Sequence, residues 1–188
     1  MKRSALLELF EPGIVLFDPV QLAGFVKSKG LADTNIFNAF LAEETLGQQA
    51  IEQGVVVPIY QITEQDYFVF AESQSREMAC LPEPAFTYSG IPLSIVSGVL
   101  VVSDLNALLD WDEGFFLNYK ATYECRLPNN DYIEVEPGIY SLSIKGYTGL
   151  QQCSSGQGYG LEFFAVPRLP VIADGADVSD LDFELTSL

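Results

Sequence analysis

The chain contains no histidine and few cations: 9 Lys and Arg stand against 26 Asp and Glu in 188 residues, for a formal charge of −17. Histidine is the side chain best suited to proton transfer and metal binding near neutral pH, so its absence excludes Ser-His-Asp and Cys-His catalytic sites. The shortage of cations argues against binding nucleic acid or an acidic membrane, because both repel an anionic protein. These absences favour a binding protein that needs no cofactor and whose partner is basic, rather than an enzyme.

Other chemical signatures are missing as well. No GxGxxG or GxxxxGK[ST] phosphate loop occurs, and the three cysteines, Cys80, Cys125 and Cys153, are far apart. An odd number of cysteines without a CxxC pair is typical of reduced thiols in a cytoplasm, with one disulfide plus one free thiol as the alternative. No apolar run approaches the roughly 18 residues of a membrane span, and Glu8 and Glu11 interrupt the leader-like N-terminus. We therefore expect a soluble, cytoplasmic protein.

What the chain has in abundance is apolar surface to bury. Hydrophobic residues make up 48% of it, with 13 Phe and 9 Tyr, and the mean hydropathy is +0.20. A disordered acidic chain would be poor in aromatic and β-branched residues, so this chain folds around a full core in spite of its charge. Its length suits one domain, and neither an internal repeat nor a long linker divides it.

The first third of the chain has the pattern of helices. Residues 13–17 predict a short strand or a buried turn. Asp18 and Pro19 suit the N-cap and the first position of a helix over 19–30. Apolar residues at i, i+4 spacing then predict a longer helix over 34–53.

From residue 55 the hydrophobic period changes to that of strands. Residues 55–62 and 67–71 predict a hairpin with a polar turn, and residues 105–111 a brief helix. Further strands are predicted over 86–88, 93–102, 115–127, 132–135, 139–147 and 159–166. The sequence therefore predicts a single α+β domain over 1–188. N-terminal helices (about 1–54) pack on an antiparallel β-sheet (about 55–168), and an acidic tail (169–188) follows.

The middle of the chain carries much of the negative charge, with eight acidic side chains and one basic side chain over 55–112. Asp110, Trp111, Asp112 and Glu113 follow the predicted brief helix, and Asp104 lies at its start. Carboxylates attract Lys and Arg, and tryptophan is overrepresented at binding hot spots. We predict that these five residues contact a basic partner, with Trp111 as the anchor. A solvated helix end with a partly buried Trp is the plain alternative, and carboxylate-based glycoside hydrolysis is a further one.

The tail is the second predicted contact, since residues 169–188 hold five acidic and no basic side chains. Spacings of three and four residues favour a helix, whereas alternation over 179–185 favours an edge strand, and both stay open. The spacing does not match a calcium-binding EF-hand loop, and an ordinary solvated face is the alternative to a docking surface. We predict that the tail carboxylates steer the approach of the partner. They are Asp174, Asp177, Asp180, Asp182 and Glu184.

Two segments carry a resemblance to known proteins: DYIEVEPGIYSLSI at 131–144 and YGLEFFAVP at 159–167. They resemble small bacterial inhibitor proteins, namely immunity proteins of contact-dependent and type VI toxin systems and the nuclease inhibitor of the competence apparatus. In such proteins a strand with an acidic residue, a glycine and a tyrosine precedes a strand that ends in an apolar residue and a proline. The resemblance implies an inhibitor with a protein partner, and it transfers no individual residue.

Charge and resemblance together predict an immunity or antitoxin-like inhibitor that blocks a basic toxin. A nuclease effector fits best, because a nuclease holds phosphates with cations. An acidic nucleic-acid mimic that blocks a DNA-binding protein is one alternative. A structural or assembly protein with a large self-association surface is another, and the sequence leaves the oligomeric state open.

Overall fold

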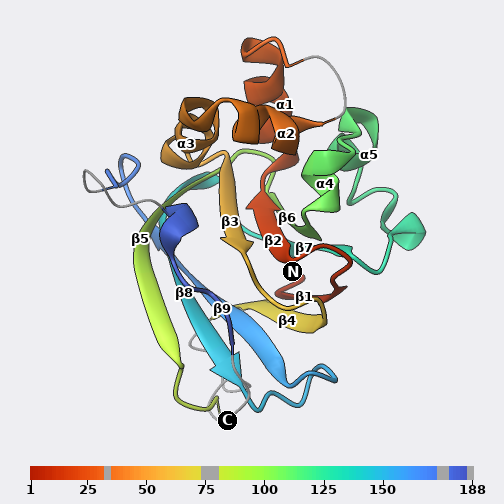
Figure 1. Cartoon of the computed structure of the whole chain (residues 1–188), viewed down its shortest axis with the longest axis vertical. Coiled ribbons are helices and arrows are strands. Elements are labelled where there is room, and N and C mark those ends of the chain that lie inside the picture. The colour runs from red at the N-terminus through yellow and green to blue at the C-terminus, as the bar shows by residue number, and fades with distance from the viewer. Residues whose placement is uncertain (32–34, 73–80, 173–177, 186–188) are drawn as a thin grey trace.

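The computed structural model describes residues 1–31, 35–72, 81–172 and 178–185, and it is an α+β fold as predicted. The described strands form two sheets (Figure 1). The five-stranded sheet has the order β1 (Ser4–Glu8), β4 (Asp66–Ala71), β9 (Gln157–Ala165), β8 (Gly138–Thr148) and β5 (Phe86–Ile95). The four-stranded sheet has the order β3 (Val56–Tyr60), β2 (Gly13–Phe17), β6 (Val99–Asp104) and β7 (Asn130–Glu134). The helices are α1 (Pro19–Ser28), α2 (Ile36–Ala42), α3 (Glu44–Glu52), α4 (Asn106–Leu109) and α5 (Glu113–Leu117).

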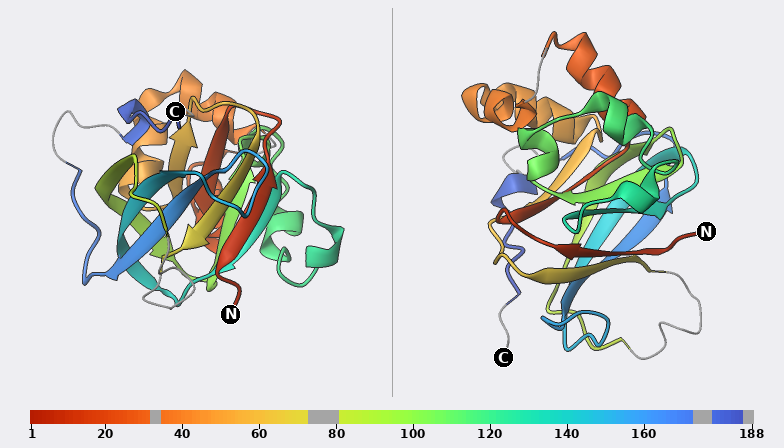
Figure 2. Two further views of the ribbon diagram at one scale, coloured as in Figure 1. Left: turned by 90° about the horizontal axis from the view of Figure 1, so that it is seen from below. Right: turned by 90° about the vertical axis from the view of Figure 1, so that its right-hand side faces the viewer.

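The two sheets are joined at both edges and enclose one core. The backbone N–H of Ser94 in β5 donates to Gly54 O, just before β3, at 2.9 Å, and that of Glu134 in β7 donates to Lys2 O at 2.8 Å. A continuous cluster of buried apolar side chains fills the space between the sheets. Strand β2 is buried along its whole length. The helices gather at the end of the molecule where the four-stranded sheet lies, and the five-stranded sheet extends away from them (Figure 1 and Figure 2).

Helix α1 begins as the sequence predicts, and its cap has a second role. One carboxylate oxygen of Asp18 accepts the backbone N–H groups of Val20 and Gln21 at 2.8 and 3.1 Å. The other accepts the backbone N–H groups of Val96 and Ser97 at 2.8 and 2.6 Å and the Ser97 hydroxyl at 2.8 Å. Asp18 is fully buried. It therefore ties the start of a helix to the turn between β5 and β6, and charge-assisted bonds of this kind are strong.

That turn corrects one prediction, since residues 93–102 form the end of β5 and the start of β6 rather than one strand. Gly98 has a φ of +79° in the turn, which a glycine adopts without strain. The predicted hairpin over 55–71 is also wrong. Strand β3 pairs with β2, whereas β4 pairs with β1 and, in parallel, with β9, so the sheet that contains β4 is mixed.

The helices are not confined to the N-terminal part. Residues 115–127, predicted as a strand, form most of α5 and the 3₁₀ turn Tyr123–Cys125. The aromatic residues there follow a helical spacing: Tyr119 contacts Phe115, with ring centroids 5.4 Å apart, and Tyr123, with centroids 6.1 Å apart. The predicted helix over 34–53 is two helices, because Glu43 is extended with φ −132° and ψ 90°. Strand β1 was not predicted.

Candidate protein-binding groove

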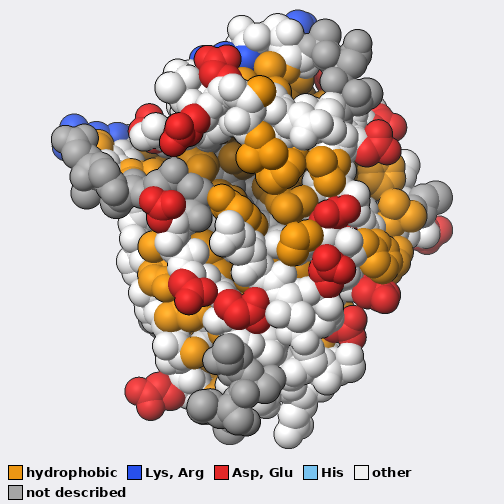
Figure 3. All heavy atoms as spheres, viewed as in Figure 1, with side chains coloured by type: hydrophobic (Ala, Val, Ile, Leu, Met, Phe, Trp, Pro, Cys, Tyr) orange, Lys and Arg blue, Asp and Glu red, His pale blue; other side chains and the backbone are white. Residues whose placement is uncertain are grey.

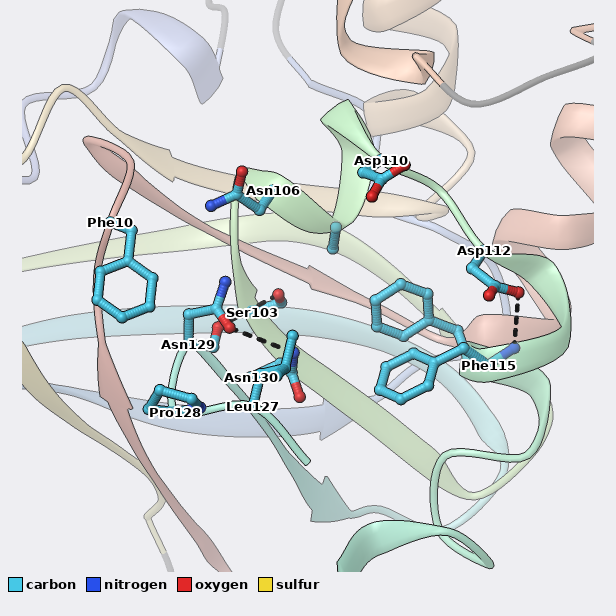
Figure 4. A pocket seen from close by; sticks show the side chains of 12 residues that line it. Phe10, Ser103, Asn106, Asp110, Asp112, Phe115, Leu127, Pro128, Asn129 and Asn130 are labelled. Atoms are coloured by element: carbon cyan, nitrogen blue, oxygen red, sulfur yellow. Dashed lines mark hydrogen bonds between the residues drawn. The ribbon is translucent and has the colours of Figure 1, made fainter. Parts of the chain in front are cut away.

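A groove of about 440 Å³ opens on one side of α4, where the sequence analysis located the central acidic cluster (Figure 4). Its walls come from the loop after β1, from α4 and α5, and from the loop before β7. The lining residues are Phe10, Ser103, Asn106, Ala107, Asp110, Asp112, Phe115, Phe116, Leu127, Pro128, Asn129 and Asn130. Phe10 lies on one side and Phe115 on the other, with the polar side chains of Asn106 and Asn129 between them (Figure 4).

Asp104 holds this groove together from beneath. Its buried carboxylate accepts the backbone N–H of Phe10 at 3.3 Å and that of Asn106 at 3.0 Å. It also accepts hydrogen bonds from the side-chain Nδ2 atoms of Asn106, at 3.0 Å, and Asn129, at 2.9 Å. Asp104 thus bonds to three segments that are far apart in sequence. Asp104 was predicted to contact a partner, but it is 0% exposed and offers no surface for that contact in this structure.

Trp111 is likewise part of the interior. Its indole is 8% exposed and stacks on the ring of Phe116, with centroids 5.2 Å apart and planes at 8°. It meets Phe17 of β2 edge-on, with centroids 5.9 Å apart. Trp111, predicted as the anchor of the partner contact, therefore packs in the core and presents little surface to a partner. Its packing fixes the turn that carries Asp110 and Asp112.

Asp110, Asp112 and Glu113 are exposed, as a partner contact requires. Asp112 caps α5 by accepting the backbone N–H of Phe115 at 2.9 Å. Asp110 and Glu113 make no side-chain hydrogen bond or ion pair with any residue that the structure describes. Asp110 and Asp112 line the groove, and Glu113 lies beside it.

Three lysines of the described chain pair with carboxylates outside the groove, and no described Lys or Arg pairs with Asp110 or Asp112. Lys2 pairs with Asp131 at 3.1 Å and Lys145 with Glu72 at 2.6 Å. Lys120 pairs with Glu134, and together with the backbone N–H of Lys2 it lowers the pKa of Glu134 to about 2. The carboxylates of the groove therefore have no cation partner within the described ranges.

Exposed apolar side chains border the same groove. Phe10 is 50% and Leu127 56% exposed, although both are large and hydrophobic. Viewed as in Figure 1, the surface shows hydrophobic side chains gathered in its middle and right with acidic side chains around them, and basic ones near the upper edge (Figure 3). Apolar side chains framed by charge are the usual composition of a binding surface.

A second groove, of about 400 Å³, lies on the other side of α4. Helices α2 and α3, strand β3 and the far side of α4 supply mostly apolar walls, including Leu41, which is 68% exposed. Glu44 and Asp180 are the charged residues that line it. Of the predicted tail residues within the described ranges, Asp180 alone lines one of these two grooves, and it is exposed.

The tail packs on the molecule through its apolar residues. Residues 178–180 form a 3₁₀ turn, and Phe183 and Leu185 are buried. The hydroxyl of Tyr159 donates to Phe183 O at 2.9 Å, and that of Tyr88 donates to Asp182 O at 2.9 Å. Burial raises the pKa of Tyr159, so this hydroxyl keeps its proton at physiological pH. The described part of the tail is neither an α-helix nor a strand.

The described tail carboxylates differ in the hydrogen bonds that they accept. Glu184 accepts the backbone N–H of Thr63 at 2.8 Å and its hydroxyl at 3.1 Å, so it fastens the tail to the loop between β3 and β4. Asp182 is exposed and accepts the backbone N–H of Glu184 at 3.0 Å. Asp174 and Asp177 lie outside the described residues.

Several lining residues escaped sequence reasoning. Phe10 lies in the leader-like N-terminus, and Asn129 and Asn130 lie between the segments 115–127 and 132–135 that predict strands. Asn106 falls within the predicted brief helix over 105–111, and Ser103 comes just before it. The available signal was the pair of asparagines in one turn, since amides buried beside a carboxylate form directed hydrogen bonds. No group of three or more Cys, Asp or Glu within the described ranges is arranged to hold a metal ion, and no described helix is long and apolar enough to span a membrane.

Comparison with known proteins gives structural likenesses alone. No family model matches the chain, and no curated protein matches it significantly. Among solved structures, ComJ from Bacillus subtilis, an inhibitor of the DNA-degrading activity of NucA, has a TM-score of 0.46 at 10% identity over 87% of this chain and 96% of its own. A protein described as crocagin biosynthetic gene J has a TM-score of 0.45 at 9% identity over 86% and 96%. With TM-scores below 0.5, neither likeness assigns a function to this chain.

Proposed function

We propose that this protein is an immunity or antitoxin-like inhibitor that binds and blocks a basic protein, a nuclease effector, through the groove beside α4. One observation carries the proposal: Asp110 and Asp112 stand at the groove without a cation partner in the described chain, and the exposed Phe10 and Leu127 line the same groove. The protein acts by occupying its partner rather than by turnover.

The charge supplies the reason for a basic partner. An exposed carboxylate interacts at a distance with cations of an approaching protein, which raises the association rate. A nuclease surface that holds phosphates is cationic, so an acidic groove can cover it. The exposed apolar side chains then contribute short-range affinity, because burying them on association removes apolar area from water.

The test begins with the protein as it exists. Tagged protein is used to capture its partner from the cells that make it at low salt, and the purified partner is assayed for cleavage of DNA and RNA with and without an equimolar amount of this protein. We expect a basic partner whose nuclease activity is blocked, and an association rate that falls steeply as salt rises. A captured protein with unaffected activity, or with no nuclease activity, contradicts the proposal.

Paired variants then locate the surface. The double variant Asp110→Asn with Asp112→Asn keeps the α5 cap, because asparagine caps helices as well as aspartate does. We expect it to weaken binding by roughly tenfold or more. The matched control is Asp180→Asn with Glu44→Gln, which removes two charges at the second groove and should weaken binding by at most about threefold through long-range charge. Equal losses in the two pairs would show that net charge, not this groove, sets the affinity.

A further inference from the structure

Most polar groups of the groove beside α4 present acceptors. Asn130 is the exception, because its Oδ1 accepts the Tyr119 hydroxyl at 2.5 Å and its Nδ2 donates to Asn129 Oδ1 at 3.5 Å. The Asp104 carboxylate accepts hydrogen bonds from the amides of Asn106 and Asn129, which turn their NH₂ ends toward it. Their carbonyl Oδ1 atoms are thereby turned away from Asp104, and that of Asn129 keeps one lone pair besides the one that accepts Asn130 Nδ2 at 3.5 Å. The hydroxyl of Ser103 donates its hydrogen to Asn129 O at 3.3 Å. The lone pairs of the Ser103 oxygen are not used in that bond.

The orientation is fixed rather than adjustable. Asn129 is 6% and Ser103 1% exposed, so neither side chain is free to turn over in solvent. The Oδ1 of Asn106 accepts no hydrogen bond from the described residues. Together with the carboxylates of Asp110 and Asp112, the groove therefore offers charged and neutral acceptors from α4, from the turn after it and from the loop before β7.

Aromatic side chains complete the lining. The rings of Phe10 and Phe115 lie on opposite sides of the polar groups (Figure 4). A cation beside an aromatic face is attracted by the ring quadrupole, and a planar guanidinium also stacks on it. A site with aromatic sides, several acceptors and net negative charge fits a flat cation that has many donors.

We propose that this groove receives one arginine side chain from the partner. The inference rests on the proposed function and names the chemistry of its contact. Arginine presents five N–H donors in a rigid fork and is weakly hydrated, whereas the lysine ammonium is compact and strongly hydrated. Acceptors that come from different segments match the fork better than they match a point charge. An arginine seated here also neutralises carboxylates that have no cation partner within the described chain.

The direct test uses short peptides and needs no partner. Acetyl-Gly-Arg-Gly-amide is titrated into the ¹⁵N-labelled protein while the side-chain amide resonances of Asn106 and Asn129 are followed. The same titration is made with lysine and with citrulline, which is close to arginine in shape but uncharged, in the central position. We expect saturable shifts of both amides at millimolar arginine peptide, with binding weaker by about threefold or more for lysine and absent for citrulline.

Variants separate the groove from general charge. Asp110→Asn should weaken arginine binding by about fivefold, as expected for one ionic contact at a solvent-exposed rim. Glu113→Gln removes the same charge three residues further on, outside the lining, and should change it by less than about twofold. Phe10→Ala should weaken it as well, and Asn106→Ala should abolish the shift of the Asn129 amide at the same peptide concentration.

The outcomes distinguish the two proposals. The arginine site is overturned if the arginine and lysine peptides bind equally. It is also overturned if the resonances of both side-chain amides stay unchanged on titration. If the partner's nuclease is nevertheless blocked and the block needs Asp110 and Asp112, the proposed function stands and this inference alone falls. If the peptide binds as expected but no nuclease is blocked, the arginine site stands without that function.

Discussion

Two grooves flank α4, and they are similar in size but different in construction. The first, of about 440 Å³, is built on directed hydrogen bonds to Asp104 and carries Asp110 and Asp112. The second, of about 400 Å³, is walled mainly by apolar side chains of α2, α3 and β3, and its most exposed one is Leu41. One short helix thus presents a polar side and an apolar side to two cavities.

The comparison teaches what each cavity can recognise. Hydrogen bonds to a buried carboxylate have fixed directions, so the first groove is preorganised and loses little entropy when it binds a polar group. Apolar contacts have no direction, and the walls of the second groove can adjust to different shapes. We therefore expect specific recognition of charge at the first groove, as the proposed function requires.

The largest effect should follow from removing the support of the first groove. Asp104→Ala leaves four hydrogen-bond donors without their acceptor, and we expect the free energy of unfolding to fall by roughly 3 kcal/mol or more. For a chain of this length that corresponds to a melting temperature lower by about 6–12 °C. Calorimetry and urea unfolding measure both quantities. A variant that melts within about 2 °C of the parent would show that Asp104 does not support the groove.

The next effect is a loss of affinity for the partner without a loss of folding stability. Phe10 is half exposed, so Phe10→Ala should leave the free energy of unfolding within about 0.5 kcal/mol. Affinity for the partner should fall by about 2 kcal/mol, the loss typical of an aromatic hot spot. Isothermal titration and urea unfolding of the same sample separate the two. Unchanged affinity would remove Phe10 from the interface.

A matched change in the second groove sharpens the contrast. Leu41 is 68% exposed, and Leu41→Ser should change the free energy of unfolding by about 0.5 kcal/mol or less. Partner affinity should stay within about twofold, because this groove carries little of the recognition. An affinity loss as large as that of Phe10→Ala would place the partner on both sides of α4.

The smallest effect is expected at Glu134, a partly exposed carboxylate that serves as a comparison for the buried Asp104. The pKa of Glu134 is lowered to about 2, first by the hydrogen bond from Lys120 and then by that from the Lys2 backbone. A lowered pKa stabilises the fold above the ordinary carboxyl value, and the stabilisation is lost as the pH falls toward the lowered one. The difference in urea midpoint between the parent and Glu134→Gln should be small at pH 7 and vanish between about pH 4.5 and pH 2. A difference that persists at pH 2 would contradict this cause.

Sequence reasoning succeeded where the determining interactions are local. The α+β class, the cap at Asp18 with Pro19, and strands β8 and β9 all follow from periodicity and nearby turn residues. It failed where the structure of a segment is determined by contacts with residues far away in the sequence. The residues on either side of 61–65 go to different sheets, and the chain turns at 96–98 because Asp18, some 80 residues away, binds the backbone there.

The predicted site residues differ in exposure. Asp110 and Asp112 are exposed and line a groove, and their contact with a partner stays a prediction. Trp111 and Asp104 were assigned to the surface but are buried, since burial depends on packing against Phe17 and Phe116 and on donors from residues 10 and 129. A single sequence does not bring those segments together.

Strand β4 lies between β1 and β9, so its two neighbours come from opposite ends of the described chain. On the ribosome, β1 and β4 emerge long before β9, and the sheet stays incomplete until about residue 165 has left the exit tunnel. Pairing across such separations is slow, because loop closure must precede any stabilising contact. The pairing of β4 with β9 is therefore expected to be a late step of folding, and the edge of β4 that β9 covers stays unpaired until then.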